Sequence, residues 1–374
     1  MAFCCMSVKM IGRQSVLYDE PPVITARASV AGEKEGDGPL GKLFDEVVTD
    51  PMAGQNTWEK AESTLQEKVV EHLLSKAGVS GKDVRYILSG DLLGQLIASS
   101  FGLAKYNIPY FGLFGACSTM GEGMSLGSML VAGGCADRVI AVTSSHFASA
   151  EKQFRFPLEY GNQRPLSATW TVTGSGGVVI EKAVGCNAGY SGKVCIKGVM
   201  TGSGAFLVGQ KESHVRISGL TVGKIVDYGV KDSFNMGASM APACADLIYS
   251  NLRDFGVEPG HYDKIFTGDL GYVGQRILID LLKEKGIDIS EIHSDCGMII
   301  FDQNTQDTHA GGSGCGCAAA TLCAYILRRM EEGKYKRVLF VPTGALMSTV
   351  SYNEGMSIPG IAHGVVLERI ENQR

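Results

Sequence analysis

Residues 78–91 read GVSGKDVRYILSGD and residues 256–269 read GVEPGHYDKIFTGD, two stretches that match without a gap at a shift of 178 positions. Each follows a segment in which apolar residues recur every three or four positions, which is typical of an amphipathic helix. Each stretch then contains a short apolar run that is typical of a strand, and this run is followed by Gly-Asp. In the first copy, Asn56 with Glu59 three residues later predicts the start of the helix, and Gly78 predicts its end. The chain therefore contains an internal duplication.

Two further matches follow in the same order along the chain. Gly115–His146 matches Gly314–Ala345 at a shift of 199 positions, and GVVIEK (177–182) matches GVVLER (364–369) at a shift of 187. The shift differs among the three matches, which indicates that residues were added or lost between them. We place these length changes in connecting loops, where added residues cost little free energy. We predict an α/β fold of two similar halves, residues 1–190 and 191–374, with mainly parallel sheets and helices packed between and outside them.

The composition excludes several classes of protein. With 45% hydrophobic and 20% charged residues, the 374-residue chain has the makeup of a packed globular protein rather than a disordered one. Its 34 Lys and Arg face 39 Asp and Glu, and no basic run could follow a nucleic-acid backbone. The N-terminus lacks the pattern of a secretory signal, and no apolar stretch reaches the roughly 20 residues that a spanning helix needs. We expect an intracellular protein whose contact with membranes is peripheral and whose 11 cysteines stay reduced.

Cys117 is the candidate for chemistry in the first half. It lies in LFGACSTMGEG (113–123), where an apolar strand leads through a turn into a helix rich in Gly, Ser and Met. Backbone N–H groups at a helix N-terminus stabilise a thiolate, so this position predicts a lowered pKa for the thiol. The alternative is a buried structural cysteine. Because small residues permit close approach on both sides, we predict that Cys117 lines a pocket.

The duplicated halves and the strand-turn-Cys-helix resemble the thiolase and ketoacyl synthase superfamily across essentially the whole chain. Within that superfamily, the chain resembles the stage V sporulation protein AD family more closely. The motifs that carry this second resemblance are EKEGDGPLG (33–41), SGDLL (89–93), LFGACST (113–119), SSHFASAEKQFRFPLEYG (144–161), TGSGGVV (173–179), MAPA (240–243), TGDL (267–270), GGSGCGCA (311–318) and IPGIAHGVV (358–366).

The family resemblance implies a protein of endospore formers that binds dipicolinic acid (pyridine-2,6-dicarboxylate) and helps to move it into the forespore. It implies a binding component rather than an enzyme, peripheral on the forespore membrane beside integral membrane proteins of the same transport complex. Whether calcium accompanies the ligand stays open. The superfamily resemblance further implies a homodimer formed through the sheet edge of the first half, which would cover exposed strand backbone.

Superfamily enzymes pair the cysteine with His, and with Asn or a second Cys, from the second half. Where a ketoacyl synthase has that His, this chain has Asp269, a carboxylate that would oppose thiolate formation. The other partner positions correspond to Ser313–Cys317 and to IPGIAHG (358–364), with His363 close by. We therefore predict a pocket without catalysis. Two alternatives stay open, a thiolase-like acyltransferase with Cys117 as nucleophile and a structural scaffold with a vestigial pocket.

The segment after the strand at 138–144 should run over the cleft at the carboxyl end of the sheet. It carries His146, Arg155 and Arg164, and forked guanidinium donors suit a planar dicarboxylate. The alternatives are a structural histidine and a solvated loop. The glycine-rich runs lack the Lys of a phosphate-binding loop and a complete dinucleotide fingerprint, and the cysteines lack zinc-site spacing. We expect neither a cofactor nor a resident metal.

The predicted ligand-binding residues are Cys117, His146, Arg155, Arg164, Asp269, Ser313 and His363. Asp269 also has a structural interpretation, since Asp91 occupies the matching position of the first half and both side chains could accept backbone N–H bonds at a turn. If calcium binds with the ligand, a carboxylate gains a second use, because calcium prefers several oxygen ligands.

Overall fold

The two halves form sheets with the same strand order. The structure is a computed structural model that describes residues 8–154, 164–183 and 214–371. In the first half the order is β3 (Val23–Gly32), β9 (Gly174–Glu181), β7 (Arg138–Ser145), β5 (Tyr86–Gly90) and β6 (Tyr110–Gly112). In the second half it is β10 (Val215–Val222), β16 (Gly360–Arg369), β14 (Arg337–Val341), β11 (Lys264–Thr267) and β12 (His293–Asp295). The predicted duplication is confirmed strand by strand.

Strand directions also repeat between the halves. In the first half β9 runs antiparallel to β3 and β7, whereas β5 runs parallel to β7 and β6. In the second half β16 runs antiparallel to β10 and β14, whereas β11 runs parallel to β14 and β12. Each half-sheet is therefore mixed, rather than mainly parallel as we predicted, because β9 and β16 each return beside the preceding long strand in the opposite direction.

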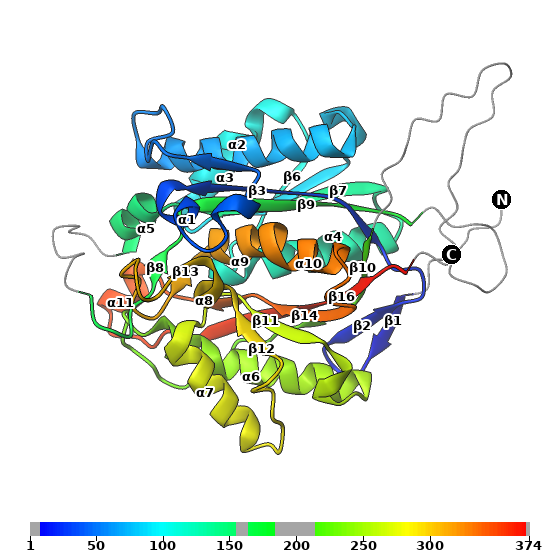
Figure 1. The fold of residues 1–374 in the computed structure, drawn as a ribbon, viewed down its shortest axis with the longest axis vertical. Coiled ribbons are helices and arrows are strands. Elements are labelled where there is room, and N and C mark those ends of the chain that lie inside the picture. The colour runs from blue at the N-terminus through cyan, green and yellow to red at the C-terminus, as the bar shows by residue number, and fades with distance from the viewer. Residues whose placement is uncertain (1–7, 155–163, 184–213, 372–374) are drawn as a thin grey trace, which may run out of the picture.

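Helices form three layers around the two sheets (Figure 1). Helices α2 (Trp58–Ala77) and α3 (Ile97–Leu103) cover the outer face of the first sheet, and α6 (Met236–Phe255) and α7 (Gly271–Lys283) cover that of the second. Helices α4 (Thr119–Ala132), α9 (Cys315–Thr321) and α10 (Leu327–Glu331) lie between the sheets. The predicted placement of helices between and outside the sheets is confirmed.

The halves interlock through the middle layer. Helix α9 belongs to the second half, yet it packs against β9 and β7 of the first. Its seven residues, CGCAAAT, are all buried, and their small side chains bring the helix backbone onto the sheet. Gly176 of β9 makes this approach possible, since a Cβ there would stand 2.3 Å from the carbonyl carbon of Ala319. The two sheets also join directly, because Val215 of β10 pairs with Ile24 of β3.

The matching outer helices end in the same way. Helices α2 and α6 both span 20 residues, and Gly78 and Gly256 terminate them in the left-handed conformation that favours glycine. At the start of α2 the capping side chain is Thr57, which accepts a hydrogen bond from the Lys60 N–H, and not the predicted Asn56. Asn235 caps α6 by accepting from the Ala238 N–H.

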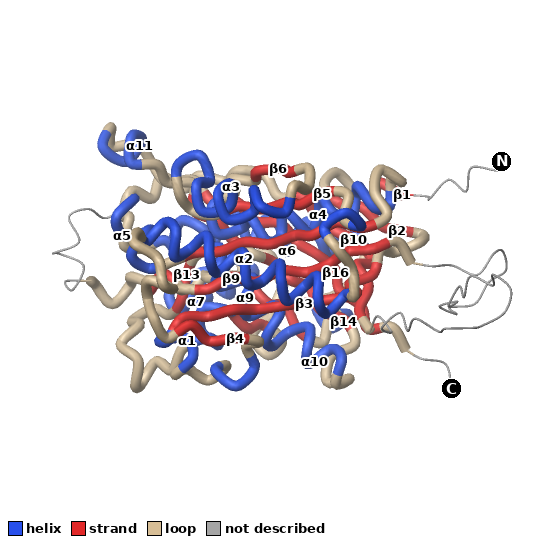
Figure 2. Tube along the Cα trace, turned by 90° about the horizontal axis from the view of Figure 1, so that it is seen from above, coloured by secondary structure: helices blue, strands red, loops and turns tan. Residues whose placement is uncertain are grey.

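Shorter elements complete the described chain. The remaining strands are β1 (Val8–Ile11), β2 (Ser15–Tyr18), β4 (Glu46–Val48), β8 (Trp170–Thr171), β13 (Gly312–Ser313) and β15 (Thr343–Ala345). The remaining helices are α1 (Glu33–Gly36), α5 (Phe147–Phe154), α8 (Cys296–Ile300) and α11 (Thr349–Asn353). Helices α5 and α11 lie at the end of the molecule opposite β1 and β2 (Figures 1 and 2). Within the described ranges, no helix combines the length and apolar character needed to cross a membrane.

Candidate functional site

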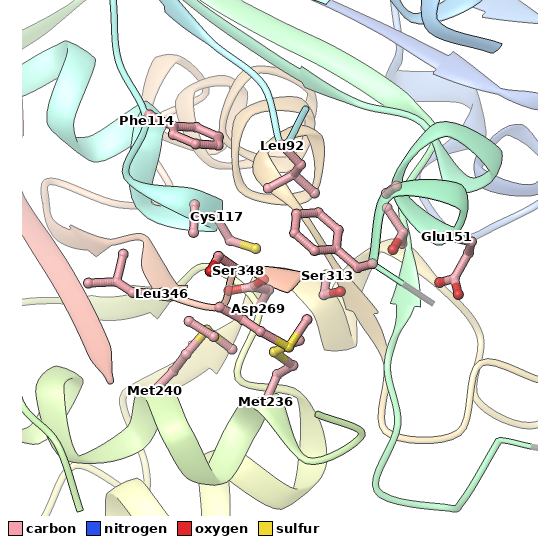
Figure 3. Close-up of a pocket in the computed structure, with 16 residues that line it drawn as sticks. Leu92, Phe114, Cys117, Glu151, Met236, Met240, Asp269, Ser313, Leu346 and Ser348 are labelled. Carbon is pink, nitrogen blue, oxygen red and sulfur yellow. The ribbon is translucent and has the colours of Figure 1, made fainter. Parts of the chain in front are cut away.

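A cavity of about 280 Å³ lies where the two halves meet (Figure 3). Its first-half lining consists of Leu92, Phe114, Ala116, Cys117, Ala150, Glu151, Phe154 and Thr171. Its second-half lining consists of Met236, Met240, Asp269, Ser313, Ala345, Leu346, Met347 and Ser348. Most of the wall is apolar, with a few polar groups from both halves. An apolar cavity with a few inward-facing polar groups is the usual form of a small-molecule site.

Cys117 reaches this cavity from a tight turn. A single turn of 3-10 helix, Ala116–Ser118, leads into α4, so the thiol stands at a helix N-terminus as predicted. Ala116 adopts φ of 52°, which a non-glycine residue rarely occupies, and its carbonyl accepts hydrogen bonds from the Thr119 hydroxyl at 2.6 Å and the Cys315 thiol at 3.0 Å. These bonds fix the turn, and the Cys117 sulfur points into the cavity (Figure 3).

The environment of Cys117 reverses the predicted pKa shift. Burial raises the pKa of the thiol well above its usual range, and the nearby Asp269 and Cys315 raise it further. The Gly314 N–H acts in the opposite direction but does not overcome burial. The prediction of a lowered pKa was therefore wrong, because desolvation outweighs the field of the helix terminus. Near neutral pH the side chain is a thiol.

Asp269 lies beside Cys117, directly after the turn that follows β11 (Figure 3). The carboxyl is fully buried and accepts hydrogen bonds from the Thr343 hydroxyl at 2.9 Å and the Gly314 N–H at 3.1 Å. Burial raises its pKa to about 7, a hydrogen bond with Cys117 lowers it, and the charge of Asp295 raises it. Asp269 can therefore exist at neutral pH both as a hydrogen-bond donor and as a carboxylate.

The matching residue of the first half has a different role. Asp91 accepts hydrogen bonds from the Leu93 and Ser99 N–H groups, as expected for a carboxylate that organises a turn. In the second half that task falls to Asp295, which accepts from the Leu270 and Gly271 N–H groups. Asp269 instead accepts a hydrogen bond from the Gly314 N–H at the start of α9, so it keeps part of the predicted structural role and also lines the cavity.

Of the other predicted contacts, Ser313 lines the cavity and the two histidines do not. Ser313 stands on β13 beside Thr171 of β8, and both side chains belong to the lining. His146 is buried behind the wall, with Nε2 2.8 Å from the Pro51 carbonyl and Nδ1 accepting from the Ala148 N–H at 3.2 Å. His363 lies on β16 outside the lining, where burial lowers its pKa to about 4. His146 therefore has the contacts of the structural alternative, and neither histidine is part of the described lining.

Of the two predicted arginines, the structure describes only Arg164. The Arg164 guanidinium lies 4.6 Å from the Trp170 ring and donates to the Asp307 carbonyl at 3.0 Å, and it is not part of the lining. Arg155 falls outside the described residues, directly after the lining residue Phe154. Among the residues that the structure describes, the lining contains two carboxyl groups, Glu151 and Asp269, and no lysine or arginine.

Sequence reasoning missed much of the second-half wall. Met236 and Met240 project from α6, and Leu346 to Ser348 follow β15. The motif MAPA (240–243) includes Met240, but a methionine on an amphipathic helix is equally compatible with the hydrophobic core and with a cavity wall. No group of three or more His, Cys, Asp or Glu residues suited to a metal occurs in the described part of the chain.

Comparisons with known proteins give one family. The family model described as Stage V sporulation protein AD (SpoVAD) matches residues 12–196 and 189–368. The Stage V sporulation protein AD of Bacillus subtilis (strain 168) is 41% identical over 362 residues, which cover 97% of this chain and 98% of that protein.

Solved structures share the architecture. The 3-oxoacyl-(acyl-carrier-protein) synthase III from Aquifex aeolicus VF5 aligns with a TM-score of 0.54 and 13% identity, covering 93% of this chain and 99% of that one. A variant of OleA from Xanthomonas campestris aligns with a TM-score of 0.55 and 11% identity, covering 96% of this chain and 99% of that one. At these identities the likeness shows the fold alone, and it confirms the predicted duplicated thiolase-like architecture.

Proposed function

The chain belongs to the stage V sporulation protein AD family, and we propose that it binds dipicolinic acid in the cavity at Cys117 and takes part in its uptake into the forespore without catalysing a reaction. The observation that carries this proposal is the pairing of Cys117 with Asp269. The cavity keeps a thiol at the N-terminus of α4, but the group beside that thiol is a buried carboxyl with a raised pKa.

That pairing favours binding over catalysis. A nucleophilic cysteine needs a lowered pKa or a neighbouring base, and here burial and Asp269 keep the thiol protonated. No imidazole belongs to the described lining that could accept the proton. Acyl transfer through Cys117 is the alternative, and a thioester trapped on Cys117 after incubation with an acyl-CoA would support it over our proposal.

The cavity wall suits a small aromatic ring with polar substituents. Phe114, Phe154, Met236 and Met240 provide apolar and polarisable surfaces for the faces of a ring. Hydroxyl groups of Thr171, Ser313 and Ser348 lie among them and can donate to carboxylate oxygens.

The charge of the wall favours the calcium complex of dipicolinate over the free dianion. A charged Asp269 would repel a dianion, because its buried carboxyl lines the cavity beside Cys117. A calcium ion held by the ligand would reverse this, because calcium takes six to eight oxygen ligands and prefers carboxylates. In this proposal Asp269 contributes an oxygen ligand to an ion that arrives with dipicolinate.

Filling the cavity should abolish binding. Met240→Trp places an indole in the space that the ligand needs, and we expect at least a tenfold weaker affinity for dipicolinate in calorimetric titration, or about 1.4 kcal/mol or more. Met356→Trp is the matched control, since Met356 is exposed outside the cavity and its replacement should leave affinity unchanged. Thermal unfolding verifies that both variants are folded. Equal binding by the parent and Met240→Trp would place the ligand elsewhere and contradict the proposal.

We also propose that the protein acts as a homodimer, peripheral on the forespore membrane and in contact with integral membrane proteins of the transport complex. Strand β6 ends the first-half sheet with all three of its residues exposed, and Phe101, Phe111 and Phe114 are exposed around it. Pairing with a second copy would cover this edge. We expect a dimer mass by light scattering and a monomer for Phe111→Asp, whereas a monomeric parent protein would contradict the dimer.

A further inference from the structure

Two hydroxyl groups of the cavity wall lie side by side without a protein partner. Thr171 of β8 and Ser313 of β13 occupy paired positions of a two-stranded parallel sheet, and both belong to the lining drawn in Figure 3. Their exposed fractions are 6% and 9%, so both residues are at least nine-tenths buried. Among the described residues, neither hydroxyl has a hydrogen-bond partner. Because a buried hydroxyl without a partner costs free energy, this pair indicates a ligand that supplies the missing contacts.

The backbone holds the two residues in register. The Trp170 N–H donates to the Gly311 carbonyl at 2.8 Å, and the Val172 N–H donates to the Ser313 carbonyl at 2.9 Å, on either side of Thr171. Paired residues of neighbouring strands project from the same face of a sheet, and the strands lie about 4.8 Å apart. Two hydroxyls at that spacing can both reach one planar group of a ligand.

A third hydroxyl, that of Ser145 at the end of β7, fixes this pair from behind. It donates to the Val172 carbonyl at 2.6 Å and accepts from the Gly316 N–H at 3.1 Å. This fully buried side chain thus bonds both the strand that carries Thr171 and the helix that follows Ser313. The two cavity hydroxyls are therefore held in place before any ligand arrives.

The other hydroxyl of the described lining and the thiol already have protein partners. Ser348 caps α11 and accepts a hydrogen bond from the backbone of that helix at 3.0 Å. Cys117 forms a hydrogen bond with Asp269. Thr171 and Ser313 are therefore the hydroxyls of the described lining that remain for a ligand.

A carboxylate suits two such donors. Its two oxygens lie in one plane and offer about four acceptor positions, whereas each hydroxyl has one hydrogen to donate. A hydrogen bond to an ionised acceptor is roughly twice as strong as one between neutral groups. Since one acceptor position is enough for a metal ion, a carboxylate that touches calcium can still accept from both hydroxyls.

We propose that Thr171 and Ser313 form a carboxylate-binding subsite, which takes one carboxylate of dipicolinate while the ring nitrogen and the other carboxylate hold calcium near Asp269. The subsite selects a dicarboxylate over a monocarboxylate. The inference rests on the proposed function for the identity of the ligand. Its geometric basis, two buried hydroxyls without a partner in the described chain, holds for any small aromatic carboxylate.

Removing either hydroxyl should weaken ligand binding without weakening the fold. Thr171→Val keeps the shape of the side chain, and Ser313→Ala removes only the oxygen. In calorimetric titration with dipicolinate plus calcium, we expect each variant to lose about tenfold in affinity, as for one hydrogen bond to a charged acceptor. In denaturant unfolding without ligand, both variants should be at least as stable as the parent, because an unpartnered buried hydroxyl is lost.

Picolinate (pyridine-2-carboxylate) tests which group of the ligand the hydroxyls contact. It keeps the ring nitrogen and one carboxylate, which together hold calcium, and it lacks the second carboxylate. We expect the parent protein to bind picolinate plus calcium at least about tenfold more weakly than dipicolinate plus calcium. Thr171→Val and Ser313→Ala should leave the affinity for picolinate unchanged, so the preference for the dicarboxylate shrinks by about tenfold in each.

Two further variants separate binding from structure. Thr305→Val is the matched control, since Thr305 is exposed outside the lining and its replacement should change neither affinity. Ser145→Ala keeps both cavity hydroxyls but leaves a buried carbonyl and a buried N–H without this partner. We expect it to lower both the affinity for dipicolinate and the stability, in contrast to the two wall variants.

Dipicolinate affinity that falls in Thr171→Val and Ser313→Ala, with picolinate affinity and stability maintained, supports the subsite. Unchanged dipicolinate affinity, an equal loss for both ligands, or a loss of stability in these variants overturns it. If the parent binds dipicolinate neither with nor without calcium, the proposed function fails, and benzoate decides the subsite alone. A rise in unfolding temperature with benzoate that is confined to the parent supports the subsite, whereas no rise, or the same rise in all three proteins, overturns it.

Discussion

Asp269→Asn is expected to be more stable than the parent protein at about pH 8, by up to about 4 kcal/mol, while losing affinity for the calcium complex of dipicolinate. The pKa of Asp269 rises from 3.8 to about 7 on folding. Between these values the folded state binds more protons than the unfolded state, so stability falls as pH rises through this window. The penalty is fully present above about pH 7, and asparagine does not incur it.

Urea unfolding at about pH 5 and pH 8 measures this difference. The parent protein should lose more stability between the two than Asp269→Asn does, since other buried carboxyls, such as Glu35 with a pKa that burial raises to about 7, act in both proteins. Asp280→Asn, a change of an exposed residue of α7 that does not line the cavity, is the matched control and should follow the parent. If Asp269→Asn shows the same pH dependence of stability as the parent, then Asp269 does not have the raised pKa proposed for it.

Gly176→Ala is expected to destabilise the protein by about 3 kcal/mol or more, although it adds one methyl group. The new Cβ would stand 2.3 Å from the carbonyl carbon and oxygen of Ala319, which are backbone atoms of α9 and cannot rotate away. Relief requires the helix of the second half to move off the sheet of the first, and overpacking of this kind usually costs about 1 to 3 kcal/mol or more. Because α9 also leads from Ser313, this shift would widen the cavity.

Gly260→Ala serves as the matched control for that change. A Cβ at Gly260 meets no atom within 4 Å, and we expect a change in stability within about 0.5 kcal/mol. Denaturant midpoints of the two variants and the parent give the comparison. A Gly176→Ala protein as stable as Gly260→Ala would contradict the close packing of α9 on β9 that joins the halves.

The fold was predictable because duplication leaves a pattern that single positions cannot. The matches at residues 78–91 and 256–269 placed α2, β5, α6 and β11 correctly, since helix periodicity and terminating glycines are local properties. Strand direction is a long-range property, and so the antiparallel pairing of β9 and β16 was not found. The N-cap also moved by one residue, from Asn56 to Thr57, because both residue types can cap and only geometry selects between them.

The site was predictable only where a residue is defined by a strand end. Cys117 and Asp269 follow the strands β6 and β11, Ser313 lies on the short strand β13, and the structure brings all three to the cavity. His146 also follows a strand, but its ring turns back to the Pro51 carbonyl, a contact between residues 95 positions apart that no local pattern reveals. The direction of the thiol's pKa shift was missed for the same reason, because burial depends on the whole fold.

Calorimetric titration of the parent protein with dipicolinate, with and without an equimolar amount of calcium, shows whether the cavity binds this ligand. We expect saturable binding that is at least tenfold tighter with calcium, because the buried carboxyl of Asp269 lines the cavity and would repel the free dianion. Absence of binding in both conditions, or binding that calcium weakens, would contradict it.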